Sequence, residues 1–391
     1  MDASSGPAPT SRDGSVREVA LLFLQLGTIG FGGPAAHIAL MRAEVVRRRG
    51  WISDQRFLDL IGVTNLIPGP NSTELAIHLG YERARWRGLI AAGVCFIVPA
   101  MLIVLGLAWA YVEYGETPAV EGVLYGIKPV VVSIIVMALL GLFRTAVKGP
   151  LLAGVAVAVL LAYLLGVNEL LLLVLGALVV VSVRTGGSWR RGAGRVHGST
   201  LPVLLAAALP VFSDASSGQL TRLFLTFLKI GAVLYGSGYV LLAFLRGDFV
   251  ERLGWLTQEQ LLDAVSIGQV TPGPVFTTAT FVGYVVAGFP GAVLATIGIF
   301  LPSFLFVALL TRIVDRIRDR PWSAALLDGA NAAALALMAG VTAQLARDAL
   351  VDPLTVGVAA GAGLLLWRTR LNSAWYIALG AAIGVVVTLV R

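Results

Sequence analysis

The sequence predicts an all-α polytopic membrane protein made of two homologous halves, and three observations support that prediction. Hydrophobic residues make up 57% of the 391 residues and charged residues only 13%, with a mean hydropathy of +0.86. An average globular protein has roughly 25% charged residues, so this chain has too few charges to cover a water-facing surface. Long uncharged stretches recur along the chain, and its second half repeats the first.

Apolar stretches long enough to cross a bilayer occur throughout, since a spanning helix needs about 20 mostly apolar residues. The long stretches without Asp, Glu, Lys or Arg are 19–41, 88–112, 149–168, 264–311 and 371–390, of which 264–311 is long enough for two crossings. Residues 223–245 are apolar except for Lys229. Shorter candidate spans lie at 129–143, 170–183, 329–346 and 353–367, because a bundle tolerates short or tilted helices.

The duplication defines the domains. A shift of 204 residues (227 − 23) places Phe23-Leu24 on Phe227-Leu228, Gly50-Trp51 on Gly254-Trp255, and Pro68-Gly69-Pro70 on Pro272-Gly273-Pro274. Chance would not preserve such groups in one register, and an internal repeat determines the fold. The predicted domains are a polar N-terminal tail (1–19), a first repeat (20–184), a basic linker with a short apolar segment (185–222), and a second repeat (223–391).

Loop charges indicate that the two repeats are inverted. The 82–87 loop holds three arginines and one glutamate, whereas its counterpart 285–290 holds no charge. The 112–121 loop is acidic, whereas its counterpart 312–320 holds four arginines and two aspartates. Basic loops face the cytoplasm, so the halves have opposite orientations. Inverted repeats around a site near the bilayer midplane are a recurring plan of secondary transporters.

Two interpretations of the crossings stay open. Each Pro-Gly-Pro segment is either a re-entrant hairpin, giving about ten spans, or a full span, giving about thirteen with 201–212 also crossing. Both interpretations place the start of the linker inside and the C-terminus outside. We favour the re-entrant interpretation because it places the basic cluster Arg47–Arg49 inside, as a topology anchor. Residues 41–60 and 245–262 are amphipathic and contain Trp51 and Trp255, which predicts interfacial helices.

The two Pro-Gly-Pro segments predict helix breaks within the membrane. Proline removes a helical hydrogen bond, and broken backbone at membrane depth must be buried in protein or line a polar cavity. A helix that restarts after each break has free amides and a positive dipole end, which is an anion site. The breaks are Pro68, Gly69 and Pro70 in the first half and Pro272, Gly273 and Pro274 in the second. The alternative is a pair of ordinary kinks with capping hydroxyls.

Polar residues at the two restarts are the candidate oxyanion ligands. We expect them to grip one small oxyanion between opposed half-helices, with Asn65 and Gln269 just before the breaks as further donors. Glu74 and His78 are four residues apart on one helix face, which suits a proton relay or, alternatively, a local hydrogen-bonded pair. The predicted ligands at the restarts are Asn71, Ser72 and Thr73 in the first half, and Thr277 and Thr278 in the second.

A second pair of candidate breaks is Gly-rich. The run 30–34 (GFGGP) has a Gly-rich partner in 235–239 (YGSGY), with Gly32 falling on Gly236, so Gly32, Gly33, Gly236 and Ser237 are further candidates for ligand approach. The alternative is close helix packing through small residues. Lys229 lies inside an apolar stretch, where an ammonium either balances a divalent anion or snorkels to the membrane surface. His37 is expected to be a core or interfacial histidine.

Several site classes are excluded by composition. One cysteine (Cys95) and three widely spaced histidines predict no metal site and no structural disulfide within the chain. No flavin, nucleotide or phosphate-loop motif is present, so no cofactor and no enzymatic activity are expected. The net charge of +7 is attributed to arginines in cytoplasmic loops, not to nucleic-acid binding.

These motifs together resemble one family. The runs 31–37 (FGGPAAH), 65–74 (NLIPGPNSTE), Gly50-Trp51 and Gly80-Tyr81 are similar to the chromate ion transporter family in its long, two-domain form. The resemblance covers about 20–390. The second half departs from the family pattern, because 235–238 (YGSG) replaces Phe-Gly-Gly-Pro and Val275-Phe276 replaces Asn-Ser. We therefore expect the first half to supply more of the polar contacts.

The resemblance implies a multi-pass secondary transporter in the bacterial plasma membrane that exports chromate and confers chromate resistance. The implied partners are the lipid bilayer and chromate, with sulfate as a similar tetrahedral dianion, and a homodimer is left open. Alternating access would rock one inverted half against the other. The alternatives are an importer or exchanger of sulfate or another oxyanion, and a membrane-embedded reductase, for which the sequence offers no motif.

Overall fold

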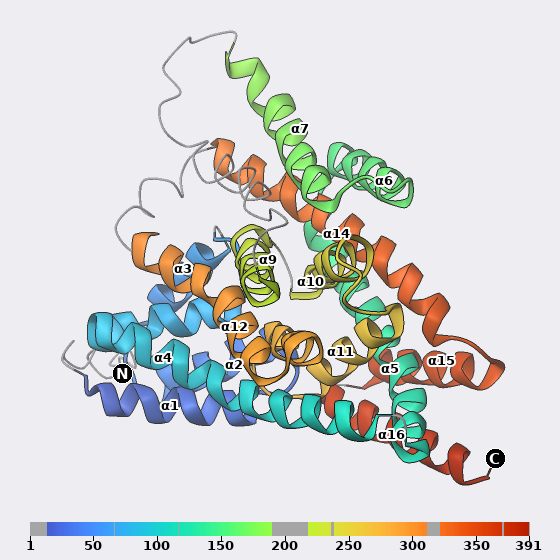
Figure 1. Cartoon of the computed structure of the whole chain (residues 1–391). Helices are drawn as coiled ribbons and strands as arrows, with labels where there is room; N and C mark the ends of the chain where they lie inside the picture. The colour runs from blue at the N-terminus through green and yellow to red at the C-terminus, as the bar shows by residue number, and fades with distance from the viewer. Residues whose placement is uncertain are drawn as a thin grey trace.

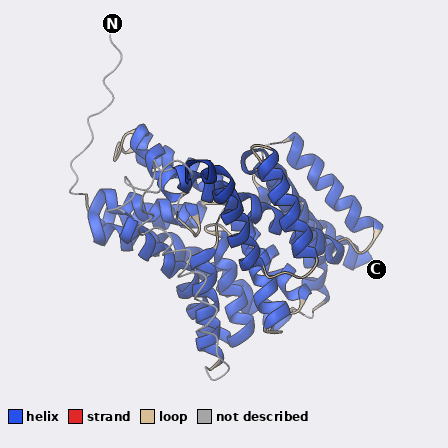
Figure 2. Ribbon diagram, turned by 90° about the horizontal axis from the view of Figure 1, so that it is seen from above, coloured by secondary structure: helices blue, strands red, loops and turns tan. Residues whose placement is uncertain are grey.

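A computed structural model describes residues 14–65, 67–115, 117–189, 218–235, 238–310, 321–369 and 371–390. Every element within these ranges is a helix, which confirms the predicted all-α class (Figure 2). The candidates Gly236 and Ser237, the apolar linker segment 201–212 and the basic loop 312–320 lie outside the described residues.

The helices of the second half repeat those of the first in the same order. The first half consists of α1 (Val16–Ile29), α2 (Gly33–Arg42), η1 (Ala43–Arg48), α3 (Asp54–Thr64), α4 (Asn71–Tyr114), α5 (Pro118–Ala146), α6 (Pro150–Leu164) and α7 (Glu169–Trp189). The second consists of α9 (Gln219–Val233), η3 (Gly238–Val240), α10 (Leu241–Leu245), η4 (Arg246–Arg252), α11 (Gln258–Val270), η5 (Val275–Thr277), α12 (Thr278–Leu310), α14 (Pro321–Ala349), α15 (Pro353–Arg368) and α16 (Ser373–Val390).

The longest helix of each half turns back on itself. In α12 the backbone leaves helical geometry at Ala287 and Gly288, and the hydroxyl oxygens of Thr280 and Thr296 are 2.7 Å apart. A straight helix would separate residues 16 apart by about 24 Å, so the two segments of α12 are antiparallel. The equivalent reversal in α4 is at 84–85, where Arg85 has φ 52°.

These reversals favour the re-entrant interpretation. Helix α3 and the first segment of α4 (71–83) are about 17 and 20 Å long, too short for a hydrocarbon core of about 30 Å. Arg56 near the start of α3 and Glu82 near the end of that segment form an ion pair of 2.5 Å. The two ends of the hairpin therefore lie side by side. In the second half, α11 and the start of α12 form the matching hairpin, so 264–311, although long enough for two crossings, forms one arm pair of a hairpin followed by one long segment.

A second re-entrant hairpin precedes the first in each half, which corrects the predicted spans 19–41 and 223–245. Helix α1 ends at Ile29 and α2 runs back, so that Glu18 at the start of α1 pairs with Arg49 just beyond η1 at 3.5 Å. In the second half, Lys229 of α9 and Asp248 of η4 pair at 2.6 Å across the same kind of reversal. Hydropathy identified both stretches as apolar but did not reveal that the chain reverses within them.

Five described helices are long and apolar enough to cross a membrane. They are Asn71–Tyr114, Pro118–Ala146, Val275–Leu309, Trp322–Ala349 and Ser373–Val390. In Figure 1, α4 runs from the edge where α1 and α3 lie towards α16 at the opposite edge.

The two halves interleave to give two bodies. The inner body comprises α1–α4 and α9–α12, in which α1 packs on α4, α9 on α12, and α4 on α12. The outer body comprises α5–α7 and α14–α16, in which α5 packs on α14, α15 and α16, and α14 on α6 and α7 (Figure 1). Each body thus contains helices from both halves. The contacts between the bodies run mainly through α10 and α11.

Candidate functional site

Four helix breaks meet at the interface between the two halves. The amide of Gly69 in the first Pro-Gly-Pro donates to the carbonyl of Leu234 at the break after α9, at 2.7 Å. The amide of Gly273 in the second Pro-Gly-Pro donates to the carbonyl of Gly30 at the break after α1, at 2.8 Å. The two bonds are equivalent under the 204-residue repeat. Each half therefore supplies a carbonyl that accepts a hydrogen bond from the broken helix of the other half.

Glycine is required at the centre of each Pro-Gly-Pro. Gly69 has φ +134° and Gly273 has φ +87°, which are left-handed conformations that favour glycine. A Cβ on Gly69 would lie 2.7 Å from the Ser303 hydroxyl and would overlap the Glu74 carboxyl group. A Cβ on Gly273 would lie 2.6 Å from that of Ala100. The breaks are thus packed against the long segments of α4 and α12.

The first restart carries free donors at a buried helix end. The carbonyl of Pro70 accepts from the amides of Thr73 at 2.8 Å and Glu74 at 3.1 Å, so the amides of Asn71 and Ser72 precede the first helical bonds. Ser72, Thr73 and Glu74 are buried. The Thr73 hydroxyl has no hydrogen-bond partner among the described residues. This helix end therefore has both the dipole and the unused donors that an anion needs.

A histidine joins the first restart to the break after α1. His37 of α2 is 2% exposed, and its Nε2 is 2.8 Å from the carbonyl oxygen of Gly30. Its Nδ1 is 3.3 Å from the hydroxyl of Ser72. The prediction of a core histidine agrees with its burial but missed these contacts. The available signal was its lack of a counterpart, because the repeat places Leu241 at this position.

A carboxyl group lies at the same break. Glu74 is fully buried, and the Ser303 hydroxyl of α12 donates to its Oε1 at 3.3 Å. The other oxygen, Oε2, has no hydrogen-bond partner among the described residues, and neither has Nε2 of His78 one helical turn further on. Sequence analysis did not identify Ser303, which lies in the second segment of α12, in the other half of the chain.

The second restart offers fewer donors. It begins with the 3-10 turn η5, and the Thr277 hydroxyl donates to the carbonyl of Pro274 at 2.8 Å. The Thr278 hydroxyl donates to the carbonyl of Val275, also at 2.8 Å. Both predicted ligands therefore use their hydroxyl hydrogens within their own turn. Among the described residues, the hydroxyl at the breaks without a hydrogen-bond partner is that of Thr73, in the first half.

The side-chain amides near the two breaks differ in the opposite way, because here the donor without a partner belongs to the second half. The side-chain amide of Asn71 donates to the side-chain oxygen of Asn65 at 2.8 Å, so these two predicted ligands bond to each other. The side-chain nitrogen of Gln269, the counterpart of Asn65, is buried without a hydrogen-bond partner among the described residues. Gly32 and Gly33 lie at the break after α1, and both have a positive φ.

Comparison with known proteins decides the family. The family described as "Chromate transporter" matches residues 17–181 and 221–385, once in each half. The chain belongs to the chromate transporter family. It is 34% identical to a chromate transport protein of Cupriavidus metallidurans over 386 residues, which is 98% of this chain and 96% of that protein. No solved structure matches the chain.

Two further relatives align with most of this chain. A probable chromate transport protein of Synechococcus elongatus is 32% identical over 95% of both chains. A chromate transport protein of Pseudomonas aeruginosa is 32% identical over 90% of this chain and 87% of the relative. The resemblance noted in the motifs is therefore confirmed over both repeats of the transporter.

Lys229 of this transporter does not offer a free charge. Its ammonium is 2.6 Å from the Asp248 carboxylate, which also binds Arg252 at 2.9 Å. The Lys229 side chain is 12% exposed and that of Asp248 is 4% exposed. The lysine is thus neither a bare counter-ion for the substrate nor a snorkelling residue. Lys229 on α9 neutralises Asp248, a buried aspartate on η4, across the reversal that follows α9.

This pairing predicts a stability effect for Lys229. Replacing Lys229 with alanine leaves Asp248 buried with Arg252 as its remaining cation, and should lower the free energy of unfolding by about 3 kcal/mol. The double variant Lys229→Ala with Asp248→Asn should regain most of that loss. Thermal denaturation of the purified variants in detergent measures both. Equal loss in the single and double variants would contradict the pairing.

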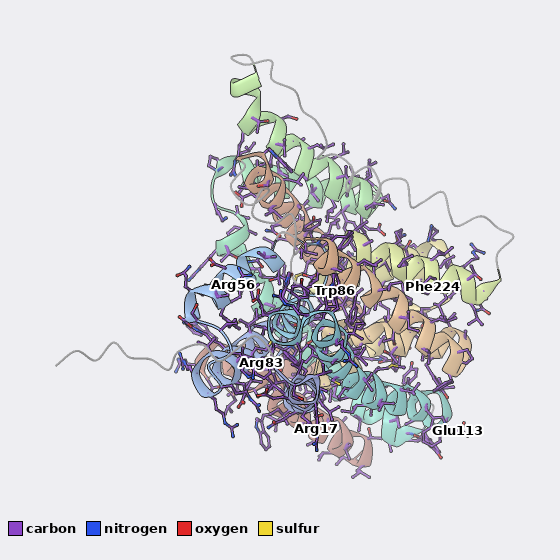
Figure 3. All side chains as sticks on the ribbon, turned by 90° about the vertical axis from the view of Figure 1, so that its left-hand side faces the viewer. Arg17, Arg56, Arg83, Trp86, Glu113 and Phe224 are labelled. Atoms are coloured by element: carbon purple, nitrogen blue, oxygen red, sulfur yellow. The ribbon has the colours of Figure 1, made fainter. Side chains whose placement is uncertain are left out.

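The two Pro-Gly-Pro hairpins differ in exposure. Leu58 of α3 is 46% exposed, whereas its counterpart Leu262 of α11 is 1% exposed. Asn65 at the end of α3 is exposed as well. Helix α3 is therefore less covered by the rest of the protein than its counterpart α11. Figure 3 views the molecule from the side on which α3 lies, where Arg17, Arg56 and Arg83 are labelled.

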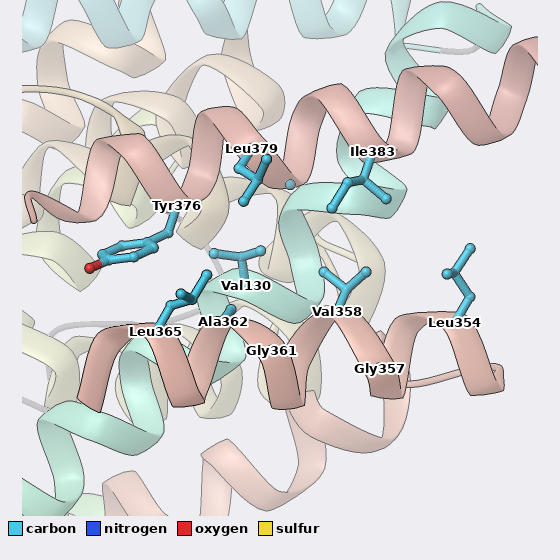
Figure 4. A pocket seen from close by; sticks show the side chains of 11 residues that line it. Val130, Leu354, Gly357, Val358, Gly361, Ala362, Leu365, Tyr376, Leu379 and Ile383 are labelled. Atoms are coloured by element: carbon cyan, nitrogen blue, oxygen red, sulfur yellow. The ribbon is translucent and has the colours of Figure 1, made fainter. Parts of the chain in front are cut away.

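A pocket of about 280 Å³ lies elsewhere, between α5, α15 and α16 (Figure 4). Apolar side chains such as Val130, Leu365 and Ile383 line it, together with Gly357 and Gly361. It has no charged lining residue, so it does not suit a dianion. The oxyanion site of the transporter is better placed at the breaks.

Proposed function

We propose that the protein is a secondary active transporter that exports chromate across the bacterial plasma membrane and thereby confers chromate resistance. The observation that carries the proposal is the meeting of four helix breaks around one buried helix N-terminus with unused donors. The curated relatives named as chromate transport proteins support the choice of substrate.

The dianion binds at the first restart. The amides of Asn71 and Ser72 and the hydroxyl of Thr73 donate to it, and the helix dipole adds positive potential. The second restart closes the site from the other half with its backbone amides and helix dipole, since the Thr277 and Thr278 hydroxyls donate within their own turn. Because a tetrahedral dianion presents four acceptor oxygens, donors from opposite sides bind it better than one helix end alone.

Glu74 couples the site to protons. A carboxylate and a dianion in one low-dielectric site repel each other, so Glu74 is protonated when chromate is bound. Export itself requires no proton gradient, because a dianion leaving a negative-inside cell gains about 2.3 kcal/mol per charge per 100 mV. His78, one turn along the same helix, passes the proton onward.

The moving unit is the inner body, not one half of the chain. The halves share helices in both bodies, so rocking one half against the other would break the packing of α5 on α16 and of α14 on α7. The contacts between the bodies are fewer and include an ion-pair cluster: Lys128 of α5 binds the exposed Glu259 at 2.9 Å and the buried Asp263 at 3.0 Å, both on α11. Movement of the inner body opens this cluster.

Cross-links distinguish the two kinds of motion. In a Cys95→Ser background, Lys128→Cys with Glu259→Cys joins the bodies, and a short bifunctional thiol reagent should stop transport. Tyr125→Cys with Asp352→Cys joins the two halves within the outer body, where the native side chains are 2.5 Å apart, and the same reagent should leave transport intact. Rocking of the halves predicts loss in both pairs, and that result would overturn the two-body account.

Chromate flux into everted membrane vesicles tests the function. Vesicles with the protein should accumulate unreduced chromate, and excess sulfate should compete weakly. A sulfate transporter is the second candidate, because sulfate has the same charge and shape. Preferential sulfate flux would replace the substrate, and recovery of reduced chromium would indicate an enzyme.

A further inference from the structure

The hydrogen bonds of His37 leave it only one neutral form. Its Nε2 faces the carbonyl oxygen of Gly30 at 2.8 Å, and a carbonyl only accepts hydrogen bonds. Nε2 therefore carries a hydrogen in every protonation state that keeps this bond. In the neutral ring Nδ1 is then bare, and it accepts the hydroxyl hydrogen of Ser72 at 3.3 Å. The Ser72 hydroxyl hydrogen is thus turned away from the restart.

Protonation of the ring reverses this bond. An imidazolium donates from both nitrogens, so Nδ1 donates to the Ser72 oxygen and the Ser72 hydroxyl hydrogen is released. That hydrogen then joins the amides of Asn71 and Ser72 and the hydroxyl of Thr73 as a donor to an anion. The imidazolium also brings a positive charge into a site that otherwise offers only dipoles.

We propose that His37 is a proton-linked positioning residue that binds a proton when the oxyanion binds, and aims the Ser72 hydroxyl at the anion. The inference rests on the proposed binding of chromate at the first restart. Because linkage is reciprocal, the anion favours the protonated ring by the same factor by which the protonated ring favours the anion.

Other titratable groups lie near His37, so the experiment must distinguish its protonation from theirs. The elements packed against α2 are α1, η1 and α4. Helix α4 contributes Glu74 and His78 in its buried part. The charged residues of α1 lie in its first turn, remote from the break, and Glu44 at the start of η1 pairs with Arg48 and Arg49. Tyr235, at the break after α9, lies within electrostatic reach of Glu74. A measurement must therefore resolve His37 itself, since Glu74 also responds to pH.

Nitrogen-15 NMR of histidine-labelled protein in lipid gives that resolution. The chain has three histidines, and the His37→Asn spectrum assigns the His37 signals. Saturating chromate should move the protonation midpoint of His37 upward by about one pH unit, which corresponds to about tenfold tighter chromate binding to the protonated form. In Ser72→Ala, which keeps the ring, the shift should shrink by more than half.

The possible results distinguish a failure of the His37 role from a failure of the proposed function. An unchanged His37 midpoint while the wild-type protein binds chromate would overturn the role of His37 and leave the proposed function standing. An equal shift in Ser72→Ala would contradict the hydroxyl switch. Absence of chromate binding to the wild-type protein would overturn the proposed function and this inference with it. If His37→Asn does not fold, His37 is assigned from the Ser72→Ala spectrum, where its Nδ1 signal moves.

Discussion

Replacing Gly69 with alanine is expected to abolish chromate transport. The backbone at Gly69 has φ +134°, and an added Cβ would overlap Glu74 and lie 2.7 Å from the Ser303 hydroxyl. To relieve both contacts the chain must move the amide that donates to Leu234, and that bond holds the breaks of the two halves together. The measurement is initial chromate uptake by everted vesicles at matched protein levels.

Gly50→Ala is the matched control for this prediction. Gly50 also has a positive φ, at +59°, but a Cβ there meets no atom within 4 Å. Both variants carry the backbone cost of alanine in a left-handed conformation, about 1–2 kcal/mol, and only Gly69→Ala has the steric conflict. Transport retained in Gly69→Ala would show that the break tolerates a rebuilt backbone and would count against the assembled site.

Replacing Glu74 with glutamine should remove much of the pH dependence of chromate binding. In the wild-type protein the affinity for chromate falls as the pH rises, because the Glu74 carboxylate then repels the dianion. Glutamine has a similar shape and stays neutral, so at pH 8.5 the KM of the variant should be at least about tenfold lower than that of the wild type. The part of the pH dependence that His37 contributes remains in this variant.

Chromate uptake rates at pH 6 and pH 8.5 measure this effect, and Glu113→Gln is the control. Glu113 lies near the other end of α4 and is exposed, so its replacement should leave both KM values unchanged (Figure 3). Identical pH profiles for Glu74→Gln and the wild type would show that Glu74 does not change its charge during transport.

Local chemistry allowed much of the fold to be predicted. The Pro-Gly-Pro segments break helices wherever they occur, and the breaks at Pro68–Pro70 and Pro272–Pro274 were therefore visible in the sequence. The repeat and its inversion followed from register and loop charge. The resemblance to the chromate transporter family rested on the same residues.

Features that depend on tertiary packing could not be predicted. Residues 19–41 contain no Asp, Glu, Lys or Arg, and hydropathy does not distinguish one span from a hairpin that reverses at Gly30–Gly33. Neither role expected for Lys229, counter-ion or snorkelling residue, included its pairing with Asp248, because Asp248 comes into range only after the matching reversal in the second half. The exchange of helices between halves, as in α5 on α16, depends on surfaces that no local pattern specifies. The homodimer stays a prediction.

A cryo-EM map of the protein with chromate in lipid nanodiscs would locate the bound anion. We expect anion density within hydrogen-bonding distance of the Asn71 and Ser72 amides, enclosed by the two Pro-Gly-Pro segments. Density elsewhere, for example beside Arg56 with the four breaks empty, would contradict the proposed site.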